Sequence, residues 1–401
     1  MKAVLLAAGR GTRMEPLTDD TPKPLLPVAG KPILEHSMEI LRDEVEEIII
    51  VGGYMIEKLE QRYAGEEGVR ILNQEEALGT ADAALQAREF IDEGAIILNG
   101  DDIYGERILE LLDAPKVLAS RAEKPANYGV YEKQDGKVEN IVEKPDDPPS
   151  DLVNTGCFSV EPEFFEMLEE VERSDRGEYE ITDALEIYMD GKEIELVEAE
   201  RWIPCSYPWQ LVEANQRMIA GEVGEGSVEG MVDERAELKG NIIVEEGAEV
   251  REFSTVEGPA IIKSGCFVGP QAYIRSGTVL EQGAEVGNSE VKNSVVGEGS
   301  KVPHFSYIGD SYLGRNVNVG AGTKTANLRN DEGGVRMIVK GEIMQTGREK
   351  LGAIIGSDVK LGVNNSIKPG RKIGSGAVTD SGEKISQNVP SGMTLKDGEL
   401  K

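Results

Sequence analysis

The chain has 401 residues, of which 74 are acidic and 43 are basic, so its formal net charge at pH 7 is −31. This excess of acidic side chains argues against nucleic acid and anionic membranes as partners, because both are bound by basic surfaces. Hydrophobic residues make up 39 % of the chain, which indicates a folded globular protein, and the length favours two domains. No apolar run approaches the roughly 20 residues that a membrane helix requires.

The three cysteines lie far apart and form no Cys-x-x-Cys pair: Cys157, Cys205 and Cys266. This usage is typical of buried thiols in a reducing compartment. The apolar stretch at the N-terminus is too short for a signal peptide. We therefore expect a cytoplasmic protein.

The charge is distributed unevenly along the chain. Residues 1–220 hold 49 acidic and 22 basic side chains, a net charge of −27, whereas residues 221–401 hold 25 and 21, a net charge of −4. Four glycines between positions 221 and 230 mark a boundary between these halves. The sequence predicts one domain at 1–222 and a second, different fold at 223–401.

Short aliphatic runs alternate with amphipathic segments in the first half. The runs at 4–6, 48–51 and 96–98 have the composition of buried parallel strands, and apolar residues recur at helical spacing at 32–43 and 79–90. Strands that alternate with helices predict an α/β domain with a Rossmann-like sheet. Ligands bind such sheets beyond the carboxyl ends of the strands.

In the second half, an aliphatic residue returns every six positions. The strict series comprises Val244, Val250, Val256, Ile262, Val268, Ile274, Leu280 and Val286, and it continues with slips of one residue as far as Ile373. This hexapeptide repeat predicts a left-handed parallel β-helix, whereas antiparallel strands with glycine turns would show a period of two. Residues 326–352 interrupt the repeat and are expected to form a loop that projects from the β-helix.

A glycine-rich segment follows the first predicted strand. It runs from Leu6 through Ala8, Gly9, Gly11, Thr12 and Arg13 to Met14, and Pro22-Lys23-Pro24 comes shortly after it. Two glycines let backbone N–H groups approach phosphate oxygens, and Arg13 and Lys23 add fixed positive charge. The combination predicts a cradle for a triphosphate, although a Gly-x-Gly pair alone is often only a tight turn.

These segments resemble the sugar-phosphate nucleotidyltransferases, whose signature is a Gly-x-Gly-Thr-Arg loop followed by Pro-Lys. The resemblance implies that Arg13 and Lys23 are catalytic cations in the attack of a sugar 1-phosphate on a nucleoside triphosphate. The residues that it implies in nucleotide binding are Ala8, Gly9, Gly11, Thr12, Gln74, Gly79 and Thr80, with the Gln74 amide on a pyrimidine. Those that it implies in binding the sugar phosphate are Gly129, Glu143, Lys144 and Asn154.

Asp101 follows Leu98-Asn99-Gly100 at the end of a predicted strand, and the resemblance implies that it binds Mg²⁺. A solvated loop carboxylate or a helix cap is the alternative for a lone Asp. The second metal ligand of the family, an Asp or Asn, corresponds here to Pro204, which has no side-chain donor. Either Asp102 or water completes the coordination shell, or this segment aligns differently.

His304 is one of only two histidines and lies in the second half. A lone His on a β-helix is by default structural or solvent-exposed. Its surroundings, however, resemble the acetyltransferase half of the bifunctional N-acetylglucosamine-1-phosphate uridyltransferases, archaeal members included. The residues that carry this resemblance are Arg275, which aligns after a one-residue gap, and Lys292, Tyr307, Asn318 and Asn327, which keep the spacing of the family.

The resemblance implies that His304 is the general base that deprotonates the 2-amino group of a hexosamine 1-phosphate as the amine attacks acetyl-CoA. An imidazole titrates near neutral pH and suits this task. Sugar-phosphate contacts would come from Arg275, Lys292, Tyr307, Asn318 and Asn327, and the coenzyme is expected near residues 362–382. The loop lysine of the family is replaced by Gly333, for which Arg329 or Arg336 is the candidate substitute.

The sequence therefore predicts a bifunctional enzyme of UDP-N-acetylglucosamine synthesis, with acetyl-CoA and UTP as cosubstrates, Mg²⁺ as cofactor and, by resemblance, a homotrimeric assembly. Glucosamine 1-phosphate is the expected acceptor, with galactosamine 1-phosphate as an alternative. Two other interpretations stay open. One is a nucleotidyltransferase for glucose 1-phosphate and UTP or dTTP whose β-helix only oligomerises. The other is a non-enzymatic regulatory subunit, against which the intact segment from Gly9 to Met14 argues.

Overall fold

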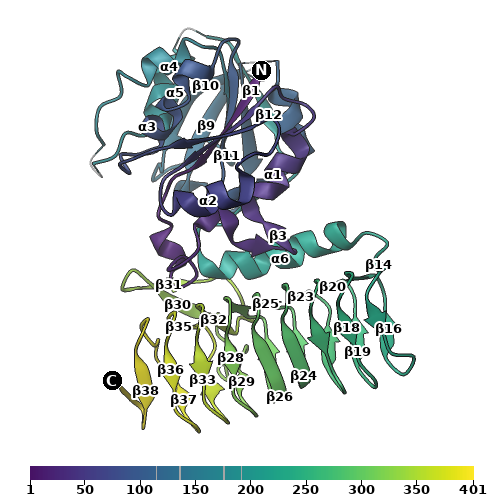
Figure 1. Ribbon diagram of the computed structural model, residues 1–401. Helices are drawn as coiled ribbons and strands as arrows, with labels where there is room; N and C mark the ends of the chain where they lie inside the picture. Colours follow the sequence, from purple (N-terminus) through teal and green to yellow (C-terminus); the bar gives the residue numbers. More distant parts are fainter. Residues whose placement is uncertain (114, 135–136, 175–176, 191) are drawn as a thin grey trace. The chain divides into compact units, whose positions relative to one another are not determined.

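The computed structural model describes residues 1–113, 115–134, 137–174, 177–190 and 192–401 (Figure 1). The chain divides into two compact units. The first, here called the sheet unit, comprises Met1–Arg10, Pro22–Leu25 and Pro32–Pro204. The second, the coil unit, comprises Gly11–Thr21, Leu26–Lys31 and Cys205–Lys401. Among the described residues, no helix is long and apolar enough to cross a membrane.

The three predicted strands of the first half form the centre of one sheet. Strand β1 (Lys2–Ala7) pairs in parallel with β4 (Ile48–Gly52) on one side and with β6 (Ala95–Asn99) on the other. Alternate side chains of β1 enter two different cores, Val4 and Leu6 on one face and Ala3 and Leu5 on the other. Because the strands are buried on both faces, they appear in the sequence as unbroken aliphatic runs, and this prediction is confirmed.

The sheet is mixed and has nine strands in the order β5-β4-β1-β6-β11-β8-β12-β10-β9. It changes direction at β11 (Leu152–Val160), which is antiparallel to β6. The remaining strands are β5 (Val69–Asn73), β8 (Lys116–Arg121), β9 (Gly129–Gln134), β10 (Lys137–Glu143) and β12 (Ile194–Glu198). A separate antiparallel pair joins β7 (Asp102–Tyr104) to β13 (Trp202–Pro204).

Helices cover both faces of this sheet, as expected for a Rossmann-like architecture. One face packs α3 (Thr80–Leu85), α4 (Phe164–Met167) and α5 (Ile181–Met189), and the other packs α1 (Ile33–Leu41) and α2 (Ile56–Tyr63). The segment predicted to be helical at 79–90 is helical only to Leu85 and ends in a 3-10 turn at Arg88–Phe90.

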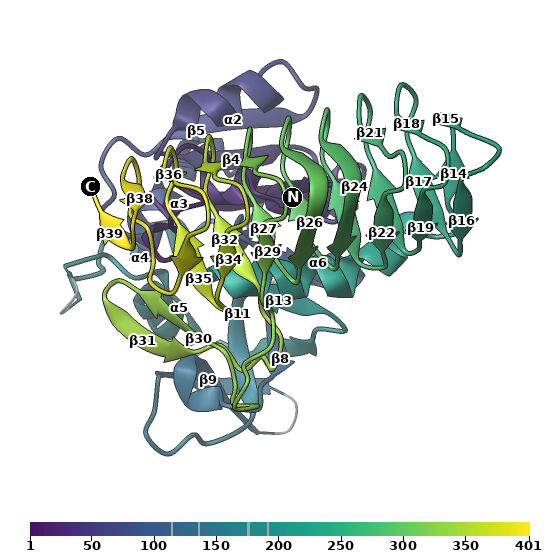
Figure 2. The ribbon, with the colours of Figure 1, turned by 90° about the horizontal axis from the view of Figure 1, so that it is seen from below.

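In the coil unit, α6 (Pro208–Val223) is followed by short parallel strands that stack coil on coil (Figures 1 and 2). Ile242 pairs with Ala260, which pairs with Thr278, so each early coil is 18 residues long and holds three hexapeptides. The middle coils are shorter: Tyr273, Glu290 and Tyr307 are in register 17 residues apart. This shortening explains the slips in the sequence repeat.

The strands of this coil stack, residues 227–400, form three rows. The first row comprises β14 (Ser227–Val228), β17 (Ile242–Val244), β20 (Ala260–Ile262), β23 (Thr278–Leu280), β25 (Val295–Val296), β27 (Tyr312–Leu313), β32 (Ala353–Ile355) and β35 (Arg371–Ile373). The second comprises β15 (Met231–Val232), β18 (Glu249–Val250), β21 (Phe267–Val268), β24 (Glu285–Lys292), β26 (Lys301–Gly309), β28 (Asn318–Val319), β33 (Lys360–Leu361), β36 (Val378–Thr379), β38 (Thr394–Lys396) and β39 (Glu399–Leu400). The third comprises β16 (Glu237–Lys239), β19 (Thr255–Glu257), β22 (Tyr273–Arg275), β24, β26, β29 (Lys324–Thr325), β34 (Ser366–Ile367) and β37 (Lys384–Ile385).

The repeated aliphatic residues fill the inside of the coils, and the predicted repeat is confirmed as the core. Val256, Ile262, Val268 and Ile274 are fully buried, and the same cluster extends to Leu395. Burying each such side chain stabilises the fold by about 1.5–3 kcal/mol. The aliphatic residues thus form the core, and the corners and outer faces of the coils are left to carry chemistry.

The interruption at 326–352 projects from the coil stack, as expected, but it is not only a loop (Figure 2). It contains an antiparallel hairpin formed by β30 (Arg336–Val339) and β31 (Glu342–Gln345). Val335, Met337 and Val339 are buried, with a more exposed residue between each pair. This alternation of buried and more exposed residues is typical of a strand and was already present in the sequence. The prediction of a loop alone is therefore wrong for this part of the insertion.

Candidate functional site

Lys23 and Asp101 form an ion pair in the sheet unit, although 78 residues separate them in the chain. Lys23 begins a 3-10 turn and is only 5 % exposed, while Asp101 follows β6 and Gly100. Gly100 is closely surrounded, because a Cβ there would lie 2.9 Å from Leu34 Cδ1 and 3.1 Å from Leu6 O. A buried ammonium group is costly unless it is paired. The structure thus brings a predicted catalytic cation to the predicted metal ligand.

The carboxylate that follows Asp101 in the chain, that of Asp102, is already engaged in a hydrogen bond. Pro204 lies opposite Asp102 in the β7–β13 pair, while the buried Asp102 carboxylate accepts a hydrogen bond from Trp202 Nε1 at 3.2 Å. Across the described ranges, no three His, Cys, Asp or Glu side chains gather as a metal site. Mg²⁺ typically binds one or two carboxylates together with waters and substrate phosphates, so this donor set fits it. No motif in the sequence indicated the contact between Trp202 and Asp102.

Gln74, Gly79 and Thr80 lie together at the start of α3. The Gln74 side chain is buried, and its Nε2 donates to Gly79 O at 3.0 Å and to Asp82 Oδ2 at 2.7 Å. These two acceptors set the orientation of the amide and leave its carbonyl oxygen as the group that a ligand can use. Thr80 Oγ1 accepts a hydrogen bond from Ile181 N at 3.0 Å, so this hydroxyl already holds the start of α5.

Replacing Gly79 with alanine is expected to destabilise the sheet unit. Gly79 has φ +124°, and a Cβ there would lie 2.3 Å from Tyr179 O, a backbone atom that cannot swing away. We expect the free energy of unfolding in urea to fall by about 3 kcal/mol. Gly68→Ala is the control, because φ is +75° there but nothing lies within 4 Å of the added Cβ. Equal losses for both variants would contradict the role of the Tyr179 contact.

The residues predicted to bind the sugar phosphate lie on adjacent strands of the sheet unit. Gly129 on β9 is directly opposite Glu143 on β10, and a Cβ on Gly129 would lie 3.0 Å from Glu143 Oε2. Lys144 follows with φ +44°, and its Nζ lies 2.7 Å from Glu143 Oε1. On β11, Asn154 Oδ1 accepts hydrogen bonds from Tyr131 OH at 3.0 Å and Gly156 N at 2.8 Å. The pairing of β9 with β10 and β11 therefore brings these four residues to one part of the sheet.

The glycine-rich segment begins in the sheet unit, directly after β1. Ala8 is buried, and its carbonyl accepts a hydrogen bond from Tyr54 N at 3.1 Å. Gly9 is exposed, and nothing lies within 4 Å of the position that its Cβ would take. Gly9 therefore leaves its backbone accessible to a ligand, which is the property that phosphate binding requires.

The segment continues in the coil unit. Gly11 has φ +65°, a conformation that favours glycine, and its carbonyl accepts a hydrogen bond from Met14 N at 2.8 Å. Thr12 begins the 3-10 turn Thr12–Met14. The guanidinium carbon of Arg13 lies 5.3 Å from the centroid of the Tyr207 ring, whose face it covers. Arg13 itself is exposed and keeps its charge available to an anion.

Late coils hold the rest of this segment within the coil unit. Arg315 Nη2 forms an ion pair with Asp20 Oδ2 at 2.6 Å. Lys372 Nζ donates to Glu15 O at 2.9 Å, and Ser375 Oγ donates to Pro16 O at 3.1 Å. The turn that carries Arg13 is therefore followed by a stretch with defined partners on the coil stack.

On the coil stack, Arg275, Lys292 and Tyr307 come from three successive coils. Arg275 is in register with Lys292, and Glu290, two residues earlier, is in register with Tyr307. Arg275 Nη1 forms an ion pair with Glu290 Oε1 at 2.9 Å, and this contact raises the pKa of Arg275. Tyr307 OH accepts a hydrogen bond from Asn327 Nδ2 at 3.2 Å. Four of the five predicted sugar-phosphate residues of this half are thus neighbours.

Asp310 is the residue of this cluster that the sequence analysis missed. It is 3 % exposed, and its Oδ1 accepts a hydrogen bond from Asn293 Nδ2 at 2.8 Å while its Oδ2 lies 3.2 Å from Lys292 Nζ. Asn327 Nδ2 donates to Asp310 Oδ2 as well. Asp310 has φ +48°, which the Gly-Asp-Ser corner around it could have signalled. The Asp310 carboxylate therefore contacts both Lys292 and Asn327.

His304 and Asn318 are not part of this cluster of contacts. His304 lies on β26 opposite Asn288, it is exposed, and no hydrogen bond from its imidazole to another described residue is found. Its main chain is held, because His304 O accepts hydrogen bonds from Gly322 N at 2.9 Å and Ser306 Oγ at 3.0 Å. Asn318 pairs with Lys301 in the second row of strands, away from the register of Tyr307.

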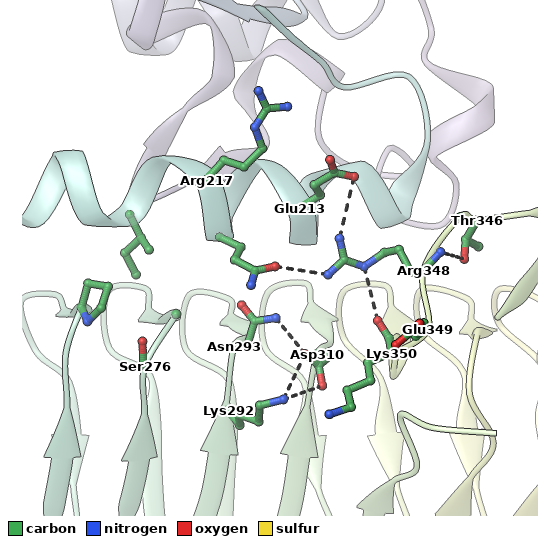
Figure 3. Close-up of a pocket in the computed structure, with 15 residues that line it drawn as sticks. Glu213, Arg217, Ser276, Lys292, Asn293, Asp310, Thr346, Arg348, Glu349 and Lys350 are labelled. Carbon is green, nitrogen blue, oxygen red and sulfur yellow. Dashed lines mark hydrogen bonds and ion pairs between the residues drawn. The ribbon is translucent and has the colours of Figure 1, made fainter. Parts of the chain in front are cut away.

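A cavity of about 920 Å³ lies beside Lys292 in the coil unit (Figure 3). Neither Arg329 nor Arg336, the candidate substitutes for the missing loop lysine, lines it. Gly333 lies near Arg329, with Arg329 Nε 3.5 Å from the position its Cβ would take. Arg329 forms an ion pair with Asp331, which lowers the pKa of that carboxyl group. Arg336 is exposed on the hairpin. The insertion instead shares this cavity with Lys292 through residues 346–350.

The chain is similar to known proteins over both halves. Residues 2–215 match the family model described as nucleotidyl transferase. The bifunctional protein GlmU of Methanococcus vannielii is 40 % identical over 399 residues, which is 97 % of this chain and 96 % of that protein. A bifunctional sugar-1-phosphate nucleotidylyltransferase/acetyltransferase of Sulfurisphaera tokodaii is 36 % identical over 405 residues, 99 % of this chain and 100 % of that protein.

A solved structure supports the fold of the first half. It is described as a candidate glucose-1-phosphate thymidylyltransferase of Bacillus anthracis in complex with sucrose, and it superposes with a TM-score of 0.50. The two chains are 27 % identical, and the match covers 54 % of this chain and 94 % of that one. Together with the full-length similarities, this places the chain among the nucleotidyl transferases and, across nearly all of its length, in the family of bifunctional GlmU proteins.

Proposed function

We propose that the chain is a bifunctional enzyme of UDP-N-acetylglucosamine synthesis. It transfers an acetyl group from acetyl-CoA to glucosamine 1-phosphate, and it transfers a uridylyl group from UTP to N-acetylglucosamine 1-phosphate with release of pyrophosphate. The observation that carries this proposal is the similarity to bifunctional relatives over almost the entire chain. In this proposal residues 1–222 perform uridylyl transfer and residues 223–401 perform acetyl transfer.

In uridylyl transfer, the chain brings anionic phosphates together and stabilises the charge that develops. Arg13 and Lys23 supply cations, and the backbone at Gly9 and Gly11 approaches the triphosphate. Mg²⁺, held by Asp101 and the substrate phosphates, would add positive charge when bound. The sugar phosphate already carries an ionised oxygen, so the attack needs no general base. Arg13 and Lys23 therefore stabilise negative charge and do not transfer protons.

Substrate recognition in this half follows from the contacts of the sheet unit. The Gln74 carbonyl accepts the N3–H of a pyrimidine, because the two N–H groups of the same amide are already taken by Gly79 O and Asp82. Backbone groups near Ala8, Gly11, Thr12, Gly79 and Thr80 contact the rest of the nucleotide. The sugar phosphate lies along Gly129, Glu143, Lys144 and Asn154.

In acetyl transfer, His304 accepts a proton from the 2-amino group as the amine nitrogen attacks the thioester carbonyl. The carbon–sulfur bond then breaks, and the proton passes to the departing thiolate, giving coenzyme A. Arg275 and Lys292 bind the phosphate end. Tyr307 and Asn327 orient the sugar: burial, followed by the charges of Asp310 and Glu290, raises the pKa of the Tyr307 phenol, so it stays neutral and can donate.

Three further properties belong to the same proposal. The coil stack is a left-handed β-helix, which fits its hexapeptide repeat and its coils of 18 residues. The chain assembles as a homotrimer, for which the near balance of charge in residues 221–401 removes an obstacle. The three cysteines are buried free thiols, which fits a cytoplasmic location.

Two assays on the purified chain test the function directly. The first measures free coenzyme A from acetyl-CoA and glucosamine 1-phosphate or galactosamine 1-phosphate. The second measures pyrophosphate released from UTP, dTTP or GTP with several sugar 1-phosphates. We expect product in both assays. Pyrophosphate without any coenzyme A would favour a nucleotidyltransferase whose coil stack only oligomerises, and neither product would favour a regulatory subunit.

Replacing Asp310 with asparagine is expected to weaken binding of glucosamine 1-phosphate. Asparagine tolerates φ +48°, but its amide cannot accept from Lys292, Asn293 and Asn327 together. We expect the KM for glucosamine 1-phosphate to rise about 10-fold, with the KM for acetyl-CoA unchanged, because a charge-assisted hydrogen bond is worth roughly 1.5–3 kcal/mol. Steady-state kinetics of acetyl transfer measures both constants.

Asp358→Asn is the matched control for this variant. Asp358 also has a positive φ, +58°, at a coil corner, and its Oδ1 accepts a hydrogen bond from Asn316 Nδ2 at 3.1 Å. It makes no contact with the cluster around Lys292. If both variants change the two KM values equally, Asp310 has only a structural role.

A further inference from the structure

The outer face of the first row of strands in the coil stack is apolar and buried. Its residues are in register from coil to coil and at most 4 % exposed, namely Ile261, Val279, Val295, Tyr312 and Ile354. The residues that follow them in each strand belong to the aliphatic core, so these side chains point the other way. Because apolar side chains are favourable only when removed from water, other parts of the chain must cover this face.

Part of the cover is Leu26–Lys31, a segment from the first half of the sequence that belongs to the coil unit. Tyr312 OH donates to Pro27 O at 2.9 Å, and Lys263 Nζ donates to Gly30 O at 2.6 Å. A Cβ on Gly30 would lie 3.5 Å from Ile261 Cδ1. The row of strands therefore binds chain from the nucleotidyltransferase half by packing and by hydrogen bonds to its backbone.

The same row continues to Lys372, which is in register with Ile354 and contacts the segment that contains Arg13. Lys372 Nζ donates to Glu15 O at 2.9 Å. Burial lowers the pKa of Lys372, whereas the charges of Glu15 and Asp19 oppose this effect, so two acidic side chains favour its ammonium form. The main chain of Lys372 is itself held by the next coil, because its N–H donates to Asn388 Oδ1 at 3.0 Å.

The segment Gly11–Thr21, here called the Arg13 turn, has further contacts with late coils besides those of Arg315 and Ser375 described above. Ser391 Oγ donates to Asp19 Oδ2 at 2.6 Å. Within the turn, Thr18 Oγ1 donates to Gly11 O at 3.0 Å, and Thr18 is buried. The turn is therefore tied internally, and four side chains of the late coils hold it from outside.

The guanidinium group of Arg13 is held by a second feature of the coil unit. It lies over the ring of Tyr207, and that ring stacks on the ring of Trp209, with centroids 4.6 Å apart and an angle of 5° between the planes. Trp209 lies near the start of α6 and is buried. A cation over an aromatic face is stabilised by about 0.5–1 kcal/mol at exposed sites, so Tyr207 favours one direction of the Arg13 side chain.

We propose that the coil unit positions Arg13 for uridylyl transfer, with Lys372 and Tyr207 as positioning residues. This proposal rests on the proposed function, in which Arg13 stabilises negative charge on the reacting phosphates. A cation contributes most to this when it is already in place before the charge develops. Lys372 fixes the backbone of the Arg13 turn, and Tyr207 fixes the guanidinium group. A residue of the acetyl-transfer half thus serves the other reaction.

The first test compares Lys372→Met with Lys384→Met in the full-length chain. Both changes remove one ammonium group from a late coil, but no contact of the Lys384 side chain with the described residues 11–21 is found. For Lys372→Met we expect the kcat of uridylyl transfer to fall roughly 10-fold, as for loss of one hydrogen bond from a charged group. Lys384→Met keeps the wild-type kcat, and Lys372→Arg, which can still donate to Glu15 O, restores most of it.

A double-mutant cycle shows whether Lys372 acts through Arg13. In a chain that already carries Arg13→Met, adding Lys372→Met should lower the kcat no further, because no guanidinium group is left to position. The same fold-loss in both backgrounds would mean that Lys372 has a structural role only and would overturn the proposal. A wild-type kcat in Lys372→Met would overturn it as well.

The aromatic contact is tested by Tyr207→Leu and Tyr207→Phe. Phenylalanine keeps the ring that lies under the guanidinium group, whereas leucine removes it. We expect Tyr207→Leu to lower the kcat of uridylyl transfer about 3-fold, in proportion to one cation–π contact, and Tyr207→Phe to keep it near the wild-type value. Equal rates for the two variants would remove Tyr207 as a positioning residue.

Hydrogen exchange tests the positioning without any activity. Met14 N donates to Gly11 O at 2.8 Å and Leu17 N to Met14 O at 3.1 Å, so both amides report the order of the Arg13 turn. We expect faster exchange of the peptide 11–21 in Lys372→Met than in the wild type or Lys384→Met. A wild-type chain that releases no pyrophosphate would refute uridylyl transfer, whereas equal exchange in all three chains would overturn the positioning by Lys372 independently.

Discussion

His304→Ala is expected to lower the kcat of acetyl transfer by about 10²–10⁴-fold, the usual contribution of a positioned general base. The amine of the sugar must lose a proton as it attacks the thioester, and His304 carries the only imidazole of the coil unit, since His36 belongs to the sheet unit. Release of coenzyme A measures this rate. Uridylyl transfer, measured by pyrophosphate release in the same preparation, should keep its wild-type kcat.

We expect His304→Ala to change catalysis without changing the fold. The His304 side chain is exposed, and its coil is held by backbone contacts of His304 O rather than by the imidazole. The midpoint of urea unfolding should therefore change little. Acetyl transfer within about 2-fold of the wild type would remove His304 as the base, since general-base catalysis is worth far more than that.

Lys23→Met is expected to lower the kcat of uridylyl transfer by about 10²–10³-fold, as for loss of one preorganised group that stabilises transition-state charge. Methionine replaces the long apolar stem of this buried side chain but removes its charge. Acetyl transfer should not change, because Lys23 belongs to the sheet unit and His304 to the coil unit.

A double-mutant cycle separates the two tasks that Lys23 could have. If Lys23 only neutralises Asp101, adding Lys23→Met to Asp101→Asn should not lower the kcat further, because no carboxylate is left to neutralise. If Lys23 also contacts the triphosphate, the double variant should be slower than Asp101→Asn alone. We expect the second result.

Local patterns were sufficient to predict most of the architecture. The runs at 4–6, 48–51 and 96–98 became β1, β4 and β6 because a strand buried on both faces can contain only apolar residues. The period of six located the core of the coil stack because each hexapeptide turns one aliphatic side chain inward. The hairpin at 336–345 was missed, although the alternation of Val335, Met337 and Val339 indicated a strand.

The candidate sites were predictable in their residue types but not in their contacts. Lys23, Asp101, Lys292 and Asn327 were predicted from segments that resemble known families. It could not show that Lys23 pairs with Asp101, because that contact depends on how a turn meets the end of a distant strand.

Only the tertiary structure decided which side chains share a site on the coil stack. With coils of 17 residues, Glu290 and Tyr307 come into register, and Asn318 falls into another row of strands. Asp310 gained its contacts in the same way, at a corner between coils. The reason is physical: burial patterns report the environment of each residue along the chain, whereas a binding site depends on coil length and register, which align residues far apart in sequence.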